Sequence, residues 1–394
     1  MTKACYVGVA GKARKVKKIY TGVANKARKV KKAYVGVAGK ARPFYSAEKG
    51  IFPYGYIGDL SVDRQNLTGI SQISPKNSRI AFFAGGNRSN GTYHEYSNAV
   101  DIYDNYLTHH TGDSLSKARE RIAAVAVTNR VLFAGGGTLS TSDIINNIDV
   151  YTYNSIHSTP NTLSQGREAI ASGQVNGGQY AIFAGGVYGA NKFTPIVDAY
   201  TETIVRTNIA ALPKAIGWAG SLELSSSFYI VGGRASANTS SKLNTIYGYS
   251  YNLVQYTGGT LHTAKWSSLC LGEVTQGYIL WGQSGASTID KSIEIINTSG
   301  VITKTTTVSG VSSANAVGTD LSSFLFAFEN YIESLVISPN GVLTRMETTL
   351  TSLAGVNYWQ RSACASVNQE YSLIAGGYTP NSLTKKCYVL KQEI

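Results

Sequence analysis

An apolar run that ends in a pair of small residues, usually Gly-Gly, recurs along most of the chain and constrains its fold more than any other feature. Two of the copies read IAFFAGG at 80–86 and VLFAGG at 131–136. The first position of each pair falls at Gly85, Gly135, Gly185, Gly232, Gly282, Phe328 and Gly376. The intervals are 46 to 50 residues, so seven copies fill the chain beyond residue 44. A fixed period of this length is typical of repeat architectures in which each copy is one supersecondary unit.

Each copy carries the patterns of four short strands. A stretch of small residues, such as 123–127 (AAVAV) or 217–221 (GWAGS), precedes the apolar run. An alternating stretch such as 148–151 (IDVY) follows it, and a shorter outer stretch such as 300–308 completes the copy. Innermost strands that converge on a common axis have room only for small side chains, so we expect the small-residue stretches to lie there.

The double glycine after an apolar strand, at this period, resembles the kelch repeat. The resemblance covers residues 45–394 and implies an all-β fold, a seven-bladed kelch-like β-propeller with four strands in each blade. The fifth copy departs from the pattern at Trp281-Gly282-Gln283, and the sixth has Phe328 and Glu329 in place of both glycines. The resemblance therefore implies a fold but no substrate or partner.

The last copy lacks a pattern for its outer strand after the alternating stretch 385–390. Without that strand the ring would keep an unpaired sheet edge. Residues 45–60 precede the first copy and are free to supply it. We therefore expect 50–56 to pair with the stretch around 387–390 and to close the ring.

The whole net charge of +13 comes from the N-terminal tenth of the chain. Residues 1–42 contain 13 Lys and Arg and no Asp or Glu, which leaves 23 basic and 23 acidic residues in the remainder. We therefore expect two parts, a basic attachment segment at 1–44 and the propeller at 45–394. The chain shows no apolar run long enough for a membrane span and no signal-peptide core, so a soluble protein made in the cytoplasm is expected.

The basic segment repeats with a period of 14 as YVGVAGKARKVKK, YTGVANKARKVKK and YVGVAGKARPF. The Gly-Lys or Asn-Lys pairs at 11–12, 25–26 and 39–40 fit tight hairpin turns, and the flanking residues alternate as strands do. A helix over KARKVKK is the alternative, which the three Gly-Val pairs disfavour. So short and charged a segment buries little core, so we expect it to become ordered by docking onto a partner.

The recurring Tyr, Lys and Arg residues are the candidates for attachment to an acidic surface of a larger assembly. They are Tyr6, Lys12, Arg14, Lys15, Tyr20, Lys26, Arg28, Lys29, Tyr34, Lys40 and Arg42. Nucleic acid is the alternative partner, because phosphate contacts need little more than positive charge. The strict repetition of Tyr and Gly favours docking by defined strands.

The same repeat, over residues 4–44, resembles the N-terminal segment of tail, baseplate and fibre-like proteins of prophages and phage-tail-like bacteriocins of Gram-positive bacteria. In that family the segment precedes varied C-terminal modules. The resemblance implies a structural component of a virion or tail-like particle, assembled in the host cytoplasm. Other tail or baseplate proteins would hold the basic segment, and the propeller would project outward for host recognition.

Residue patterns for catalysis are sparse. The five histidines (His94, His109, His110, His157 and His262) show no metal-ligand spacing, and the adjacent pair would point to opposite faces of a strand. We expect no metal site, no cofactor and no catalytic residue. Two other hypotheses stay open, a carbohydrate-active or oxidative propeller enzyme and an intracellular kelch adaptor, although the adaptor leaves the basic repeats unexplained.

Several charged residues recur with the long repeat and suggest an architectural role, such as bonding to a neighbouring turn. They are Asp101, Asp149, Asp198, Glu294, Glu333, Arg119 and Arg167.

Two loops that follow double glycines, at 87–99 and 187–195, combine aromatic and hydrogen-bonding residues on one expected face of the propeller. We expect them to contact a cell-surface glycan or protein. The candidate residues are Arg88, Tyr93, His94, Tyr96, Tyr188, Lys192 and Phe193.

Overall fold

The fold is known from a computed structural model of the chain. The residues that it describes are 6–9, 12–15, 20–23, 26–29, 32–37, 40–46, 51–73, 79–89, 94–138, 143–272, 275–280, 282–285, 288, 290, 292–307, 315–320, 323–327, 332–337, 343–348, 363–367, 371–379 and 382–392. Trp281, Phe328 and Glu329, where the repeat departs from its pattern, lie outside these residues.

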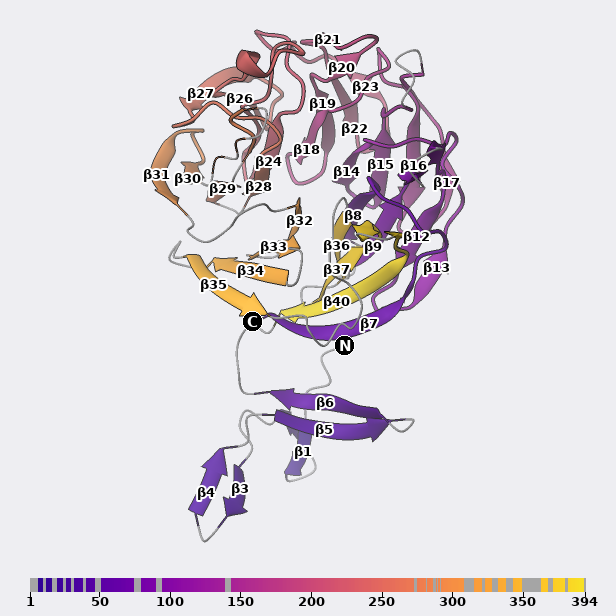
Figure 1. Ribbon diagram of the computed structural model, residues 1–394, viewed down its shortest axis with the longest axis vertical. Helices are drawn as coiled ribbons and strands as arrows, with labels where there is room; N and C mark the ends of the chain where they lie inside the picture. The colour runs from indigo at the N-terminus through magenta and orange to yellow at the C-terminus, as the bar shows by residue number, and fades with distance from the viewer. Residues whose placement is uncertain are drawn as a thin grey trace.

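The protein is all-β, as the composition and the strand patterns predict. The described part of the chain contains one short 3₁₀ helix, Thr239–Ser241, and no α-helix, so it offers no candidate for a membrane-spanning helix. Figure 1 shows many small sheets that follow one another around the body of the molecule, with separate hairpins below them.

Each 14-residue repeat of the basic segment forms one antiparallel hairpin. The hairpins are β1 (Tyr6–Val9) with β2 (Lys12–Lys15), β3 (Tyr20–Val23) with β4 (Lys26–Lys29), and β5 (Lys32–Val37) with β6 (Lys40–Ser46). The expectation that a lysine occupies each turn is wrong, because Lys12, Lys26 and Lys40 open the return strands opposite Val9, Val23 and Val37. The third hairpin also runs to Ser46, two residues past the expected boundary at 44.

Beyond the hairpins, the chain forms four-stranded antiparallel sheets. In chain order these are β8 (Thr68–Ile73), β9 (Arg79–Ala84), β12 (Val100–Tyr103) and β13 (His109–Thr111); β14 (Ala123–Val127), β15 (Arg130–Ala134), β16 (Ile148–Thr152) and β17 (His157–Ser158); β18 (Ala171–Val175), β19 (Tyr180–Ala184), β22 (Val197–Thr201) and β23 (Arg206–Thr207); β24 (Gly220–Leu224), β25 (Ser227–Val231), β26 (Thr245–Ser250) and β27 (Gln255–Thr260); β28 (Leu269–Gly272), β29 (Gln276–Leu280), β30 (Ser292–Asn297) and β31 (Ile302–Thr307); β32 (Asn315–Asp320), β33 (Ser323–Ala327), β34 (Ile332–Ile337) and β35 (Leu343–Thr348); and β36 (Ala363–Val367), β37 (Tyr371–Ala375), β40 (Lys386–Gln392) and β7 (Ile51–Asp59).

The first strands of successive sheets contact one another in chain order, from β8 through β14, β18, β24, β28 and β32 to β36, and β36 in turn contacts β8. Small side chains make these contacts close. Ser172 Oγ donates to the Ala124 carbonyl at 3.1 Å, and Ser221 Oγ donates to the Ser172 carbonyl at 3.0 Å. The arrangement is consistent with a propeller-like fold.

The last sheet takes its outer strand from the N-terminal side of the chain. In β7, Tyr56 lies opposite Tyr388 and Asp59 lies opposite Lys386 of β40. Next to this pairing, the Leu60 amide donates to the Lys385 carbonyl at 2.6 Å. The strand falls within residues 45–60, from which the sequence predicts a closing strand, but it spans 51–59 rather than 50–56.

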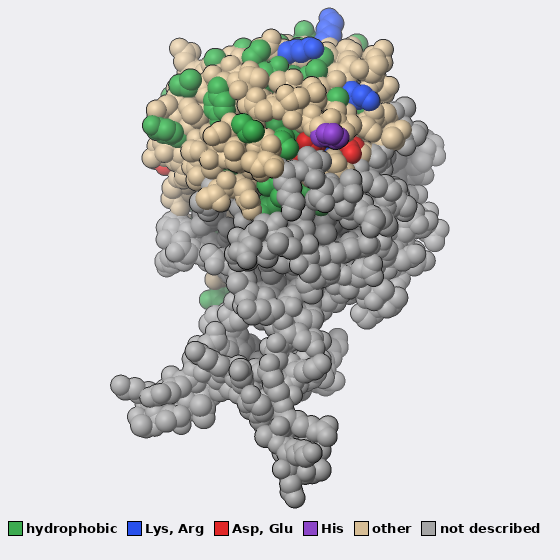
Figure 2. Space-filling model, turned by 90° about the vertical axis from the view of Figure 1, so that its left-hand side faces the viewer, with side chains coloured by type: hydrophobic (Ala, Val, Ile, Leu, Met, Phe, Trp, Pro, Cys, Tyr) green, Lys and Arg blue, Asp and Glu red, His purple; other side chains and the backbone are tan. Residues whose placement is uncertain are grey.

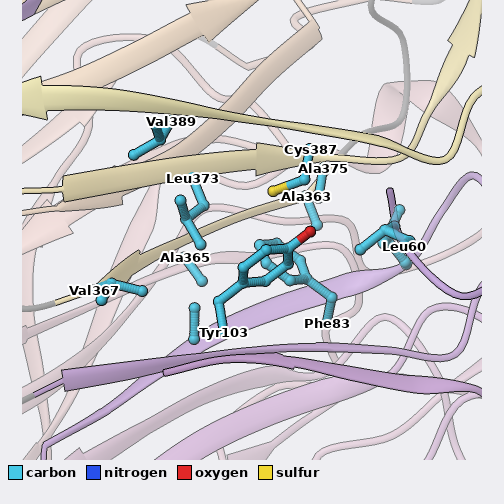
Figure 3. Packing of buried hydrophobic residues seen from close by; sticks show 12 residues of the cluster. Leu60, Phe83, Tyr103, Ala363, Ala365, Val367, Leu373, Ala375, Cys387 and Val389 are labelled. Atoms are coloured by element: carbon cyan, nitrogen blue, oxygen red, sulfur yellow. The ribbon is translucent and has the colours of Figure 1, made fainter. Parts of the chain in front are cut away.

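A shared hydrophobic cluster joins the first and last sheets. Phe83 and Tyr103 of the first sheet pack with Leu373, Cys387 and other buried residues of the last one. Figure 3 shows the Tyr103 hydroxyl directed toward the Cys387 sulfur at the centre of this cluster. Two segments that are far apart in sequence therefore bury one continuous core.

The double glycine is required by a contact between neighbouring sheets. Gly135 and Gly136 have φ of +65° and +91°, and the Gly136 amide donates to the Arg167 carbonyl of the next sheet at 3.0 Å. A Cβ atom on Gly135 would lie 2.4 Å from that same carbonyl oxygen. The equivalent bonds run from Gly86, Gly186, Gly233 and Gly377 to the carbonyls of Arg119, Ile216, Lys265 and Arg64.

We expect Gly135→Ala to lower the free energy of unfolding by about 3 kcal/mol, because it combines strain at positive φ with a backbone clash. Gly189→Ala is the matched control, since Gly189 has φ of +49° but nothing within 4 Å of an added Cβ. Its expected cost is about 1 kcal/mol. Denaturant unfolding of both variants measures the difference, and equal costs would contradict the role of the carbonyl contact.

Candidate functional site

The recurring carboxylates form buried ion pairs with recurring basic residues. Four such pairs have distances of 2.7 to 2.8 Å. They are Arg64–Asp101, Arg119–Asp149, Arg167–Asp198 and Lys265–Glu294, and all eight side chains are at most 3% exposed. The sequence patterns single out Arg119 and Arg167 but miss Arg64 and Lys265. The signal that could have found them is the motif Leu-Ser-x-x-Arg, written Leu60-Ser-x-x-Arg64 in the first copy and Leu261-His-x-x-Lys265 in the fifth.

The three arginines of these pairs also bond a carbonyl of a neighbouring strand. Arg119 Nε donates to the Gly135 carbonyl at 2.8 Å, and Arg119 Nη2 donates to the Phe133 carbonyl at 3.2 Å. Arg167 makes the same two bonds to Gly185 and Phe183. The guanidinium thus satisfies carbonyls at the end of the apolar strand, which is an architectural task.

In the three arginine pairs, the carboxylate accepts a hydrogen bond from the preceding turn and contacts a residue of the outermost strand. The Ser116 amide donates to Asp149 Oδ1 at 2.8 Å, and His157 Nε2 lies 2.7 Å from the same oxygen. Burial favours a higher pKa for Asp149, but the Arg119 charge and the hydrogen bonds from Ser116, Arg119 and His157 outweigh it and lower the pKa. Asp149 is therefore held as a carboxylate.

The Ser, Asp and His side chains of this set do not have the geometry of a nucleophilic triad. Ser116 Oγ donates to Asp149 Oδ2 at 3.0 Å, so both the serine and the histidine are directed at the carboxylate rather than at each other. Burial raises the pKa of the Cys270 thiol to about 12, which keeps that sulfur protonated and unreactive.

The adjacent histidines of β13 bond to different carboxylates. His109 Nε2 lies 2.6 Å from Asp101 Oδ1, whereas His110 Nε2 lies 3.0 Å from Asp104 Oδ2. Across the described ranges, no three His, Cys, Asp or Glu residues gather as metal ligands would.

The candidate receptor residues lie on two separate hairpins. Arg88 and Tyr96 lie on β10 (Asn87–Ser89) and β11 (His94–Tyr96), which also contains His94, while Tyr93 lies outside the described residues. The exposed Arg88 side chain is 2.9 Å from Asp63 and 3.5 Å from Glu95. Both are exposed ion pairs, which contribute little to stability.

The second hairpin leads to a cluster that sequence patterns did not identify. Tyr188 of β20 (Val187–Tyr188) lies opposite Lys192 of β21 (Lys192–Phe193). Phe193 contacts the Trp218 ring at a centroid distance of 5.5 Å. Lys192 is exposed and Phe193 is half-buried.

Arg234 completes this cluster by contacting two indole rings. Its guanidinium carbon lies 4.4 Å from the Trp218 ring centroid and 5.0 Å from that of Trp266. We call Phe193, Trp218, Arg234 and Trp266 the Arg234 cluster. Its members come from three successive copies of the repeat, since Phe193 follows β19, Trp218 and Arg234 flank β24 and β25, and Trp266 precedes β28.

Trp218 reaches the cluster because it lies outside the inner strand. The sequence prediction of an inner strand at 217–221 is wrong by three residues, since β24 begins at Gly220. Trp218 instead lies in a turn and has φ of +51°. The equivalent turn residues of other copies are Asn66, Arg121, Ala169 and Ser267, with φ of 52° to 54°. One residue per copy is therefore placed at this end of the sheets, and its identity changes from copy to copy.

The equivalent positions in the first copies form a polar network instead. Asn66 Nδ2 donates to Glu120 Oε2 at 2.8 Å, and Arg121 Nη1 donates to Glu168 Oε1 at 2.8 Å. Burial raises the pKa of Glu168, although the nearby Arg121 opposes the shift. Acids thus accompany the basic residue on these copies, whereas the Arg234 cluster contains none.

The attachment candidates all lie in the hairpins, in the same register. Tyr6 lies opposite Lys15 as Tyr20 lies opposite Lys29, and Val35 lies opposite Arg42. The remaining members, Lys12, Arg14, Lys26, Arg28, Tyr34 and Lys40, are also strand residues.

No protein-family model matches the chain, and no curated protein sequence is significantly similar to it.

Proposed function

We propose that this chain is a structural component of a phage tail or phage-tail-like particle, of the baseplate or fibre type. Residues 1–44 attach it to other tail or baseplate proteins during assembly in the host cytoplasm, and the remainder projects and binds a glycan or protein of the host surface. The observation that carries the proposal is the segregation of charge, with 13 basic and no acidic residues in 1–42 and a balanced remainder. On the described part of the face in Figure 2, few side chains are charged.

The projecting part is, in this proposal, a seven-bladed kelch-like β-propeller. The order of four strands within each sheet, the cyclic contacts of the first strands, and the pairing of β7 with β40 support it. The repeated bond from the second glycine to the next sheet, which includes Gly377 to Arg64, supports it as well. An experimental density map that resolves the blades tests this count, and six or eight blades would reject it.

The hairpins suit attachment because each forms a separate two-stranded sheet among the described strands. A two-stranded hairpin is marginally stable in water, and its open edges are available to pair with strands of another protein. Repeated positive charge adds attraction to an acidic partner and speeds the encounter. An assembly site with matching repeats would hold the three hairpins in one register.

Deleting residues 1–44 is expected to leave a soluble body that no longer incorporates into particles. The charge variant Arg14→Glu/Arg28→Glu/Arg42→Glu should lose incorporation too, because it keeps the hairpin pattern but lowers the net charge by six. Arg88→Gln, at an exposed residue of β10, is the matched control and should incorporate normally. The measurement is the amount of the chain in purified particles by immunoblot.

Normal incorporation of the truncated chain would reject attachment through this segment. A charge variant that still assembles but loses binding to duplex DNA would favour nucleic acid as the partner of the hairpins. Both variants keep β7, so a stability defect would not explain either result.

A further inference from the structure

We propose that the Arg234 cluster is a binding site for an acidic saccharide, in which a sugar ring stacks on the aromatic side chains and its carboxylate or phosphate bonds Arg234. The inference deepens the proposed function by naming the ligand class of the projecting part, and it rests on the receptor-binding half of that proposal. Within the described chain, no other arginine or lysine lies over aromatic rings without an acidic partner.

Arg234 is the first element of the argument because it lacks an anionic partner. No described carboxylate lies within ion-pair distance of its guanidinium, and its Nη1 donates only a long bond of 3.3 Å to the Ala237 carbonyl. Its buried Nε atom has no hydrogen-bond acceptor. Burial lowers the pKa of Arg234 with no opposing charge, yet a guanidinium stays protonated, so the site holds an uncompensated cation. An anionic ligand would compensate this positive charge.

Both indole rings contact the guanidinium of Arg234. Its central carbon lies 4.4 Å and 5.0 Å from their centroids, close enough for a cation–π interaction with each. A planar donor edge matches the two oxygens of a carboxylate or phosphate. Trp266 is buried and is therefore a support, whereas Trp218 and Phe193 are half-exposed and can contact a ligand.

Neighbouring residues extend the positive charge without adding an acid. Lys242 pairs with Arg234 in an isolated antiparallel β-bridge, and Lys192 is exposed next to Phe193 in the sequence. The segments 187–194 and 234–242, which surround the cluster, contain no Asp or Glu. Acidic peptides share the charge of the proposed ligand, but the aromatic surface of Phe193 and Trp218 favours a ring that can stack.

The test uses the full chain and its intrinsic fluorescence, since two of the four tryptophans belong to the cluster. Trigalacturonate supplies the carboxylate and glucose 6-phosphate the phosphate. The neutral methyl ester of trigalacturonate, inorganic phosphate and a triglutamate peptide are the controls. We expect saturable quenching by at least one acidic sugar, and the sugar that binds identifies the source of the anion.

With the parent chain, three results would overturn the inference: equal affinity for the neutral ester, equal affinity for inorganic phosphate or triglutamate, or no binding of either acidic sugar. In the variant Arg234→Gln, the affinity should fall about tenfold or more, because a charge-assisted bond is lost. Trp218→Ala should weaken binding similarly, and Arg234→Lys should be intermediate because it keeps the charge without the planar edge.

Arg206→Gln is the matched control for the arginine variants. Arg206 also lies over an aromatic ring, 5.9 Å from the Tyr200 centroid, but Asp198 is 3.4 Å away. It should bind sugars as the parent does, and thermal unfolding confirms that each variant is folded. Unchanged affinity in folded Arg234→Gln would overturn the inference. Because no particle is used, this failure would leave attachment through residues 1–44 standing, and failed attachment would leave sugar binding standing.

Discussion

Removal of residues 1–59 is expected to lower the melting temperature by about 10 °C or more relative to removal of 1–46, because several kcal/mol of strand pairing are lost. The longer truncation removes β7, which pairs along β40 from Lys386 to Gln392. It also removes Asp59, which lies 3.3 Å from Lys385, and the contact between the Tyr56 and Tyr388 rings at 5.8 Å. Differential scanning calorimetry of both truncated chains measures the effect.

Exposure of β40 should also promote association, because an unpaired edge is a template for another strand. A synthetic peptide of residues 51–59 added to the longer truncation should restore part of the melting temperature and reduce aggregation. A peptide with the same composition in scrambled order is the control. Similar melting curves for the two truncated chains would show that β7 does not contribute to the stability of the last sheet.

The strand content and the four-stranded sheets were predictable because the same pattern of apolar and small residues recurs in successive copies of the repeat. The apolar run before the double glycine becomes the second strand of its sheet, as in β15 and β19. Both glycines are needed for positive φ and for the approach of the next sheet, so this requirement appears in the sequence as a recurring Gly-Gly pair. Where a structural requirement produces no such recurring residues, the prediction failed or was not made.

The first inner strand shows why some elements could not be recognised. Its sequence, Thr68–Ile73, lacks the run of small residues found in other copies. Gly69 faces a tight contact, since a Cβ there would lie close to the Cys364 carbonyl oxygen, at 2.2 Å. That contact joins residues almost 300 positions apart, so no local pattern reports it.

The Arg234 cluster was missed for a different reason. Its residues replace the repeat pattern rather than follow it, with Trp218 where other copies have Asn66 or Arg121. Residues that differ from copy to copy give no periodic signal. Their proximity depends on the packing of successive sheets. It can be predicted from the sequence only when the position of each turn is known to within one residue.

The buried ion pairs lead to the second large expected effect. Arg119→Ala should lower the free energy of unfolding by about 3–5 kcal/mol, because it leaves the Asp149 carboxylate buried without its cation. The carbonyls of Phe133 and Gly135 would also lose a donor. Arg88→Ala, at an exposed ion pair, should cost less than about 1 kcal/mol. Denaturant unfolding at neutral pH compares the two.

The fourth sheet suggests how that loss can be reversed. There Ile216 occupies the position of Arg119, as its carbonyl bond with Gly186 shows, and Tyr247 occupies the position of Asp149. Pro213 and Gln255 likewise stand where the second sheet has Ser116 and His157. The complete polar set has thus been exchanged for a mainly apolar one, and both Ile216 and Tyr247 are buried.

We therefore expect Ser116→Pro/Arg119→Ile/Asp149→Tyr/His157→Gln to be more stable than Arg119→Ile alone, because replacing a whole buried pair costs far less than removing one partner. The free energy of unfolding of the double variant Arg119→Ile/Asp149→Tyr should lie between those two values. In a double-mutant cycle, the coupling energy between the two substitutions should be about 1–3 kcal/mol. Additive losses would contradict this explanation, since they would show that Arg119 stabilises the sheet through the strand carbonyls alone. A restored free energy of unfolding would show that each sheet needs a matched set and that the charges themselves are dispensable.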